Sequence, residues 1–110
     1  MPQGLGEFEQ MVLLAILHVK GKAYGVPIVE EIERRTGRTV SRAAVYVTLR
    51  RLEKRRLVTS WMGEPTGERG GKPRRYVRVE REGVDLLRES RRAMARMWDD
   101  LDPAIVESLP

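Results

Sequence analysis

Cysteine is absent from the 110 residues, and histidine occurs only once, as His18. The chain therefore forms no disulfide, offers no thiolate nucleophile and builds no zinc site from cysteines or from several imidazoles. The sequence also shows no nucleophile paired with a general base and no cluster of metal ligands. These absences predict that the protein is not an enzyme and uses no cofactor.

A long apolar run is missing as well. No stretch approaches the roughly 20 apolar residues that a membrane-spanning helix needs. Residues 1–4 lack the basic and then apolar composition that begins a signal peptide. We therefore expect a cytoplasmic protein without membrane contact, and a length of 110 residues suits one domain with a modest core.

Positive charge is unevenly distributed along the chain, whose net charge is +5. Residues 1–40 are neutral overall and residues 79–110 carry −3, whereas residues 41–78 hold eleven basic residues against three acidic ones and carry +8. A segment this cationic predicts an acidic partner. Its restriction to one stretch argues against a merely solvated surface.

Apolar periodicity predicts three helices in the first half of the chain. The first covers residues 8–19 and is apolar around most of its circumference, so it must be buried on two sides. We expect a second subunit to bury one of them. The second begins near Gly25, with Pro27 in its first turn. Gly37 is placed to end it in a left-handed conformation, and Ser41 is a suitable N-cap for the third helix.

The third helix is predicted to have one apolar and one cationic face. Apolar residues three or four apart point inward, namely Val45, Leu49 and Leu52. The face that points outward carries Arg42, Tyr46, Arg50 and Lys54.

Two segments rich in β-branched and aromatic residues, 57–62 and 75–79, predict the strands of a hairpin. Residues 63–73 between them contain four glycines and two prolines. This composition excludes a helix or a regular strand and predicts a flexible loop, or wing, with basic residues near its end.

A long final helix is predicted from residue 81 to residue 101. Its apolar residues follow an alternation of three and four that also includes Arg91, which is typical of a coiled-coil seam interrupted once. The seam consists of Val84, Leu87, Met94, Trp98 and Leu101. Pro103 disfavours helical geometry at Asp102 and is expected to end the helix.

Together these elements predict a mainly α fold with a small β-hairpin, a winged helix-turn-helix with a C-terminal dimerisation helix. We expect a DNA-binding domain over residues 1–79, and a dimerisation helix with a short tail over residues 80–110. The major groove of B-DNA, about 12 Å wide, accepts one helix such as the third. The cationic wing suits the minor groove or the phosphate backbone.

Six short motifs occur in a fixed order between residues 5 and 83. They are Leu5-Gly6-Glu7-Phe8-Glu9, Ala23-Tyr24-Gly25, Ala44-Val45-Tyr46, Leu49-Arg50-Arg51-Leu52-Glu53, Leu57-Val58 and Gly70-Gly71-Lys72-Pro73-Arg74-Arg75-Tyr76. This ordered set resembles the PadR family of transcriptional regulators. The resemblance implies a homodimer whose first and last helices interlock, DNA contacts from Tyr46 and from the basic residues of the third helix and the wing, and in some members a small aromatic effector.

Two positions depart from the family pattern. Members often have glycine where Arg56 follows the third helix, and threonine or serine where Glu80 precedes the last one. Arg56 must adopt a left-handed conformation, at a cost of about 1 kcal/mol, or the helix must end differently. Glu80 is a poorer N-cap than threonine, although its charge near the helix N-terminus recovers roughly a few tenths of a kcal/mol.

The sequence thus predicts a sequence-specific regulator of double-stranded DNA, a homodimeric repressor that acts on an inverted repeat and is relieved by a small effector. Candidate DNA contacts are Ser41, Arg42, Tyr46, Arg50, Arg51, Lys72, Arg74 and Arg75. Candidate dimer contacts are Phe8, Leu13, Leu17, Leu87, Met94, Trp98 and Leu101. Trp98 is also the candidate aromatic wall of an effector pocket. The alternative is a winged-helix module that binds an acidic protein surface instead of DNA.

Overall fold

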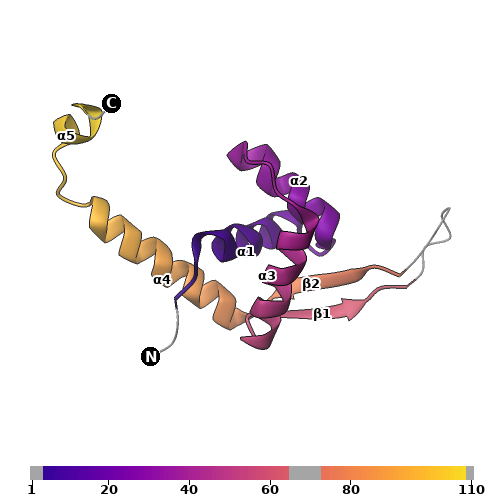
Figure 1. The fold of residues 1–110 in the computed structure, drawn as a ribbon. Coiled ribbons are helices and arrows are strands. Elements are labelled where there is room, and N and C mark those ends of the chain that lie inside the picture. The colour runs from indigo at the N-terminus through magenta and orange to yellow at the C-terminus, as the bar shows by residue number, and fades with distance from the viewer. Residues whose placement is uncertain (1–3, 65–72, 109–110) are drawn as a thin grey trace.

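The computed structural model describes residues 4–64 and 73–108. Three helices, a two-stranded hairpin and a long fourth helix follow one another, and a short fifth helix comes last (Figure 1). The elements are α1 (Glu7–Val19), α2 (Gly25–Thr36), α3 (Arg42–Lys54), β1 (Val58–Met62), β2 (Arg75–Val79), α4 (Arg81–Trp98) and α5 (Pro103–Ser108). The predicted mainly α fold with a small β-hairpin is confirmed, as is the order of the elements from α1 to α4, whereas α5 was not predicted and dimerisation through α4 stays a prediction.

Local capping explains where α2 ends and α3 begins. Gly37 has φ +74°, and its N–H donates to the carbonyl of Glu33 at 2.9 Å, so the left-handed C-cap is confirmed. The Ser41 hydroxyl accepts a hydrogen bond from the Ala44 N–H at 3.1 Å, which satisfies one of the free donors at the start of α3. These two caps fix the short link between the helices.

The end of α3 follows a Schellman arrangement built on Arg56. The Leu57 N–H donates to the Leu52 carbonyl and the Arg56 N–H to the Glu53 carbonyl, both at 2.9 Å. Arg56 has φ +61°, so the left-handed alternative is the one adopted. The side chain of Glu80 does not cap α4, and it instead accepts a hydrogen bond from the Thr59 hydroxyl at 2.7 Å.

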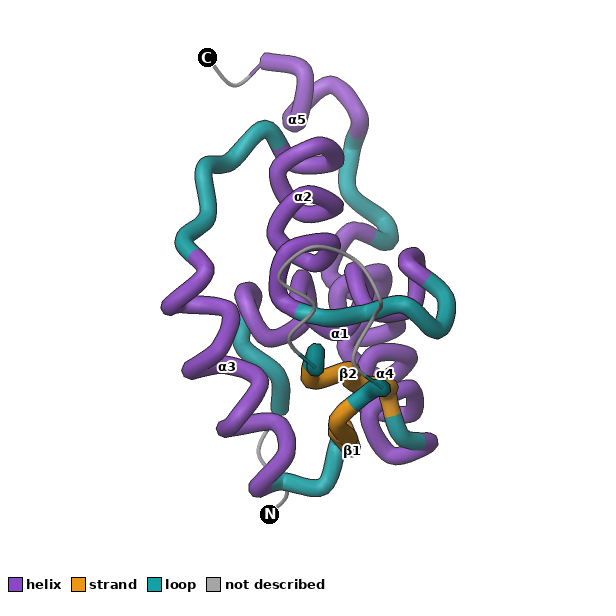
Figure 2. The backbone as a smooth tube through the Cα atoms, turned by 90° about the vertical axis from the view of Figure 1, so that its right-hand side faces the viewer, coloured by secondary structure: helices purple, strands orange, loops and turns teal. Residues whose placement is uncertain are grey.

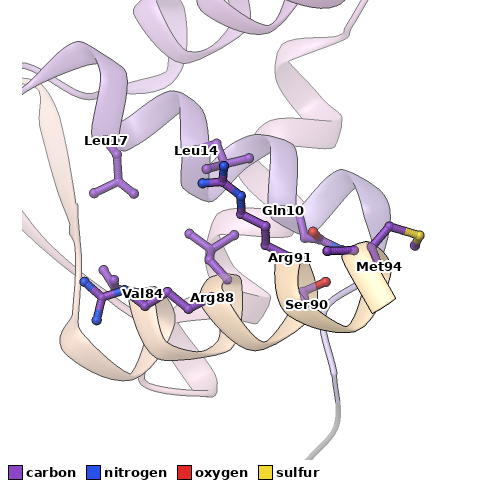
Figure 3. A pocket seen from close by; sticks show the side chains of 10 residues that line it. Gln10, Leu14, Leu17, Val84, Arg88, Ser90, Arg91 and Met94 are labelled. Carbon is purple, nitrogen blue, oxygen red and sulfur yellow. The ribbon is translucent and has the colours of Figure 1, made fainter. Parts of the chain in front are cut away.

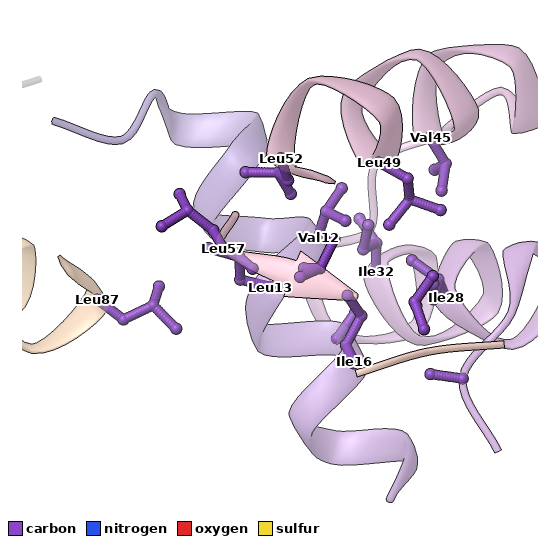
Figure 4. Packing of buried hydrophobic residues seen from close by; sticks show 14 residues of the cluster. Val12, Leu13, Ile16, Ile28, Ile32, Val45, Leu49, Leu52, Leu57 and Leu87 are labelled. Carbon is purple, nitrogen blue, oxygen red and sulfur yellow. The ribbon is translucent and has the colours of Figure 1, made fainter. Parts of the chain in front are cut away.

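The core lies between α1, α2, α3 and the base of the hairpin (Figure 4). Each of these elements contributes side chains that are almost completely buried, among them Val12, Leu13, Ile28, Val45, Leu52 and Val58. Val45, Leu49 and Leu52 of α3 all face this core, as predicted. The opposite side of α1 carries Leu14 and Leu17, which are 45% and 43% exposed.

The hairpin is antiparallel, and its register runs from Val58 opposite Val79 to Met62 opposite Arg75. The Val77 N–H on the other edge of β2 donates to the Ala23 carbonyl at 2.9 Å, which ties the hairpin to the segment before α2. Alternate residues along each strand face opposite sides. One side of the hairpin therefore faces α3 and the other faces the segment before α2.

The fourth helix leaves the body of the molecule in the direction opposite to the hairpin (Figure 1). At its start Gly83 lies so close to Leu57 that a Cβ atom would come 2.8 Å from the Leu57 carbonyl oxygen. Leu87 is the last buried residue, and every described residue from 91 to 108 is exposed. The radius of gyration is accordingly 16.8 Å, against about 13 Å for a compact chain of this length.

The end of α4 differs from the prediction. The helix ends at Trp98, and Asp100 with φ +63° turns the chain, so Leu101 lies outside the helix. Pro103 does not end this helix but begins the next one, where a missing N–H costs little. The Asp102 carboxylate accepts a hydrogen bond from the Ala104 N–H at 2.9 Å, which supports the start of α5.

Candidate nucleic-acid interface

The outer face of α3 is exposed and basic. Arg42, Arg50 and Arg51 are all exposed, and none of them forms a hydrogen bond or an ion pair within residues 4–64 and 73–108. Arg50 lines a groove between α3 and the hairpin, whereas Arg51 lies on the other side of the helix, near Leu5 and Glu9 at the start of α1. The two neighbouring arginines therefore flank the exposed face from opposite edges.

Ser41 and Tyr46 are less free than the sequence suggests. The Ser41 hydroxyl is engaged as the N-cap of α3. The ring of Tyr46, although 46% exposed, leans on the first turn of α2, because a Cβ atom at Gly25 would come 2.6 Å from the Tyr46 Oη. Tyr46 thus presents one side of its ring to solvent while the other side packs against backbone.

The groove between α3 and the hairpin has a volume of about 490 Å³ and includes Tyr46, Arg50, Glu53, Ser60, Met62 and Arg75 in its lining. We call it the α3–hairpin groove after the two elements that line it, and Figure 2 shows the course of α3 and of the two strands. Arg75 Nη1 donates to the Ser60 hydroxyl at 2.7 Å, and that hydroxyl donates to Glu53 Oε1 at 2.6 Å. Arg75 is therefore held by the protein, unlike Arg42 and Arg50.

Aromatic rings support the other side of the hairpin. The rings of Tyr24 and Tyr76 meet edge to face with centroids 5.7 Å apart, and Trp61 stacks on Tyr76 at 6.0 Å. The Arg74 guanidinium lies 4.6 Å from the centre of the Tyr24 ring, within cation–π distance. Arg74, just before β2, and Arg75, its first residue, are thus held on opposite faces of the hairpin.

The tip of the predicted wing lies outside the described residues. This segment, residues 65–72, includes Lys72, a predicted DNA contact. The described part of the hairpin nevertheless places Arg75 beside α3 and Arg74 on the opposite face, over Tyr24. Of the eight predicted DNA contacts, the structure therefore brings Tyr46, Arg50 and Arg75 to one groove, with Arg42 in the first turn of the same helix.

Acidic residues outside this face are partly neutralised by ion pairs. Arg35 and Arg34 both contact the Glu31 carboxylate and hold the pKa of Glu31 below its usual range. Glu7 pairs with Arg38 at 2.6 Å, and Glu9 lies 3.4 Å from Arg55. Glu53 is the acidic residue that lines the α3–hairpin groove.

A second groove, about 710 Å³ in volume, separates α1 from α4 (Figure 3). Leu14 and Leu17 project into this α1–α4 groove from α1, and Val84, Leu87 and Met94 line it from α4, while the Arg91 side chain extends from α4 toward Leu14. Met94 is 60% exposed. The groove is therefore a largely apolar surface that this chain leaves uncovered.

The predicted dimer contacts range from completely buried to exposed. Leu13 is completely buried in the core of the chain, so it has no surface to offer a partner, and Leu14 and Leu17 are the residues that α1 exposes. Leu87 is nearly buried and Phe8 is half-buried against the core. Met94, Trp98 and Leu101 remain exposed, and Trp98 does not line the α1–α4 groove of this chain.

The profile of the Transcriptional regulator PadR-like family matches residues 13–89. The chain belongs to this family. A PadR family transcription regulator from Clostridium difficile is 22% identical to this PadR-like chain, with a TM-score of 0.69 over 84% of this chain and 91% of the other. None of the curated proteins compared with the chain matches it.

Two further solved structures share the fold of this PadR-like regulator. A transcriptional regulator from Clostridium thermocellum is 22% identical, with a TM-score of 0.68 over 93% of this chain and 89% of the other. A PadR family regulator from Eggerthella lenta is 27% identical, with a TM-score of 0.65 over 94% and 88% of the two chains. Within the described residues, no helix has the length and apolar composition to cross a membrane.

The sequence reasoning did not single out three residues that shape the site of this PadR-like chain. Tyr24 holds Arg74, and Ser60 with Glu53 holds Arg75. Ser60 could have been found from the alternation of side chains along β1 if the hairpin register had been known, because that register pairs Ser60 with the buried Val77 on one face. Tyr24 was quoted within a motif, but its contact with Arg74 spans 50 residues and follows only from the packing of the hairpin.

Proposed function

We propose that this PadR-like regulator binds double-stranded DNA sequence-specifically as a homodimer and represses transcription from an inverted-repeat operator. The observation that carries the proposal is the outer face of α3, where three exposed arginines have no partner within the described residues. Such a face on a helix beside a basic hairpin suits the major groove of B-DNA.

Each arginine has a position that suits a different part of the duplex. Arg42 lies in the first turn of α3, from which side chains of a recognition helix reach base edges, and a guanidinium can donate two hydrogen bonds to guanine. Arg50 and Arg51 lie at opposite edges of the exposed face, so they suit the phosphates on the two sides of the groove. Arg74 and Lys72 are our candidate contacts of the hairpin with the flanking backbone or minor groove.

The homodimer is supported by the uncovered apolar surface of α1 and α4. Monomeric proteins rarely leave a row of large apolar side chains exposed along one helix, and such patches mark interaction sites. In this chain Met94, Met97 and Trp98 are 60%, 74% and 60% exposed. We propose residues 80–110 as the dimerisation segment and residues 1–79 as the DNA-binding unit, with half-sites separated by about 10 base pairs or a multiple of that distance.

We also propose that a small aromatic effector releases the regulator from DNA. The α1–α4 groove, at about 710 Å³, has the volume and apolar lining of a small-molecule site, for which about 300–1,000 Å³ is typical. Its arginines, Arg88 and Arg91, suit an acidic group on such a compound. Trp98 would join this site only if a second subunit brought it there.

The proposal is tested by selecting bound fragments from genomic or random DNA and measuring affinity for the selected duplex. We expect Arg42→Ala and Arg74→Ala each to weaken binding by about 1–3 kcal/mol without unfolding the protein. Arg92→Ala, which removes an exposed arginine of α4, is the matched control and should bind as wild type does.

Two results would contradict DNA binding. Affinity that does not fall with rising salt is one, because each neutralised phosphate contributes about −0.9 to the log–log slope. Failure to enrich any duplex, together with DNA-independent capture of an acidic protein, is the other. The second result would favour the alternative function, a winged-helix module for protein interaction.

A further inference from the structure

A chain of two hydrogen bonds links three elements across the α3–hairpin groove. Arg75 at the start of β2 donates to the Ser60 hydroxyl in β1 at 2.7 Å, and Ser60 donates to Glu53 in the last turn of α3 at 2.6 Å. No direct ion pair joins Arg75 to Glu53 in the part of the chain that the structure describes. The serine hydroxyl therefore stands between the two charges and bonds to both.

Both bonds involve a charged partner, and hydrogen bonds of this kind are stronger than those between neutral groups. Ser60 is half-buried and lies opposite Val77, whose side chain belongs to the core, so the hydroxyl has a fixed position. Strand β1 thus holds the Ser60 hydroxyl, which joins α3 to β2, in one position. Beneath this chain of bonds, Leu49 and Val77 pack the floor of the groove.

The direction of the Arg75 side chain separates it from the other arginines of this face. Its guanidinium points along the hairpin to Ser60 on the neighbouring strand, whereas Arg42, Arg50 and Arg51 have no partner within residues 4–64 and 73–108. Arg75 also begins β2, so its bonds hold the end of the hairpin from which the predicted wing extends. An arginine committed in this way suits a structural link better than a phosphate contact.

We propose that Glu53, Ser60 and Arg75 form a brace that sets the angle between α3 and the hairpin, and that Arg75 acts through this brace rather than by contacting DNA. The proposal rests on the proposed function, because the angle matters only if α3 and the hairpin bind one duplex together. Ser60 is the positioning residue on which both bonds depend. Glu53, an acidic residue on a basic face, is thereby accounted for.

The brace is tested with Ser60→Ala and Ser60→Thr, which differ in whether a hydroxyl remains at this position. We expect Ser60→Ala to weaken binding of the selected duplex about fivefold, as the loss of a hydrogen bond of ordinary net strength would. Ser60→Thr keeps the hydroxyl on a strand that favours β-branched residues, so its affinity should be close to that of wild type. Combining Ser60→Ala with Arg75→Ala should bind no more weakly than Arg75→Ala alone.

The salt dependence of binding separates a brace from a phosphate contact. We expect Arg75→Ala to lower affinity while leaving the log–log salt slope unchanged. A phosphate contact made by each of the two subunits would instead reduce the slope by about 1.8, at about 0.9 for each phosphate, as we expect for Arg74→Ala. A reduced slope for Arg75→Ala, or wild-type affinity for Ser60→Ala, overturns the brace.

Hydrogen exchange distinguishes failure of the brace from failure of the proposed function. The Gly63 N–H donates to the Arg74 carbonyl at 2.8 Å and reports opening of this end of the hairpin. Ser60→Ala should speed exchange of this amide and Ser60→Thr should not. If wild type binds no duplex, the proposed function is contradicted. If hydrogen exchange of the Gly63 amide is also unchanged in Ser60→Ala, the brace is contradicted as well.

Discussion

Tyr46 lies over Gly25 so closely that a Cβ atom on Gly25 would come 2.6 Å from the phenolic oxygen and 2.8 Å from the ring carbon that bears it. The contact joins the exposed face of α3 to the first turn of α2. It fixes one side of the Tyr46 ring against backbone, so the direction in which this side chain meets DNA depends on a glycine in another helix.

We therefore expect Gly25→Ala to displace the Tyr46 ring and to weaken DNA binding without loss of stability. The atoms that a Cβ would meet are the far end of a side chain that is 46% exposed, so the ring can turn into solvent, and alanine gains roughly 0.5–1 kcal/mol over glycine in a helix. A binding titration measures the loss of affinity, and thermal or urea denaturation checks the stability. In a Tyr46→Ala background, Gly25→Ala should have no further effect on affinity, because the methyl group then meets no ring. A Gly25→Ala variant that binds as tightly as wild type while Tyr46 is intact would rule this contact out.

Tyr24 should matter for DNA binding only through Arg74. Its ring faces the Arg74 guanidinium at 4.6 Å, and such a contact at an exposed site is worth about 0.5–1 kcal/mol. Tyr24→Leu should therefore weaken binding roughly two- to fivefold, whereas Tyr24→Phe, which keeps the ring, should not. In an Arg74→Ala background the Tyr24→Leu change should have no further effect on affinity. Additive losses in the double variant would mean that Tyr24 contributes by another route.

Glu31 should make stability depend on pH in a defined direction. Hydrogen bonds from Arg35 and Arg34 lower its pKa from 4.5. A carboxylate with a lowered pKa adds stability above its unfolded-state pKa and loses it as pH falls through its folded-state pKa. The difference in unfolding free energy between wild type and Glu31→Gln should thus be present at neutral pH and vanish in acid. Glu30→Gln, at an exposed neighbour, is the control, and an equal pH dependence for both variants would contradict the assignment.

Features decided by neighbouring residues were predictable from the sequence. Gly37 and Ser41 cap their helices through contacts within a few residues, so their types alone indicated the boundaries. Arg56 was recognised as an arginine in a position that favours glycine, and its φ of +61° follows the left-handed alternative. Helix caps and left-handed positions can be predicted from the sequence because the groups that form them lie close together in the chain.

Features decided by packing or by a distant partner were not predictable. Residues 12–17 of α1 are apolar on almost every side, so only the fold shows that Leu13 faces the core and Leu14 faces outward. The predicted end of α4 was wrong, because Asp100 turns the chain with a positive φ that aspartate adopts only occasionally. The bond from Arg75 to Ser60 depends on the hairpin register, which the long loop between the strands does not specify.

The uncovered surface of α4 makes a final prediction about assembly. Met94→Glu places a carboxylate in the α1–α4 groove beside Arg88 and Arg91, and covering these charges with a second subunit is less favourable than covering the apolar Met94 side chain. We expect this variant to be monomeric by sedimentation or light scattering, to remain folded, and to bind the selected duplex far more weakly. Arg92→Ala changes the charge by the same amount at a position two residues away, about 200° around the helix, and should stay dimeric. A wild-type protein that is monomeric, or a dimeric Met94→Glu variant, would contradict the proposed interface.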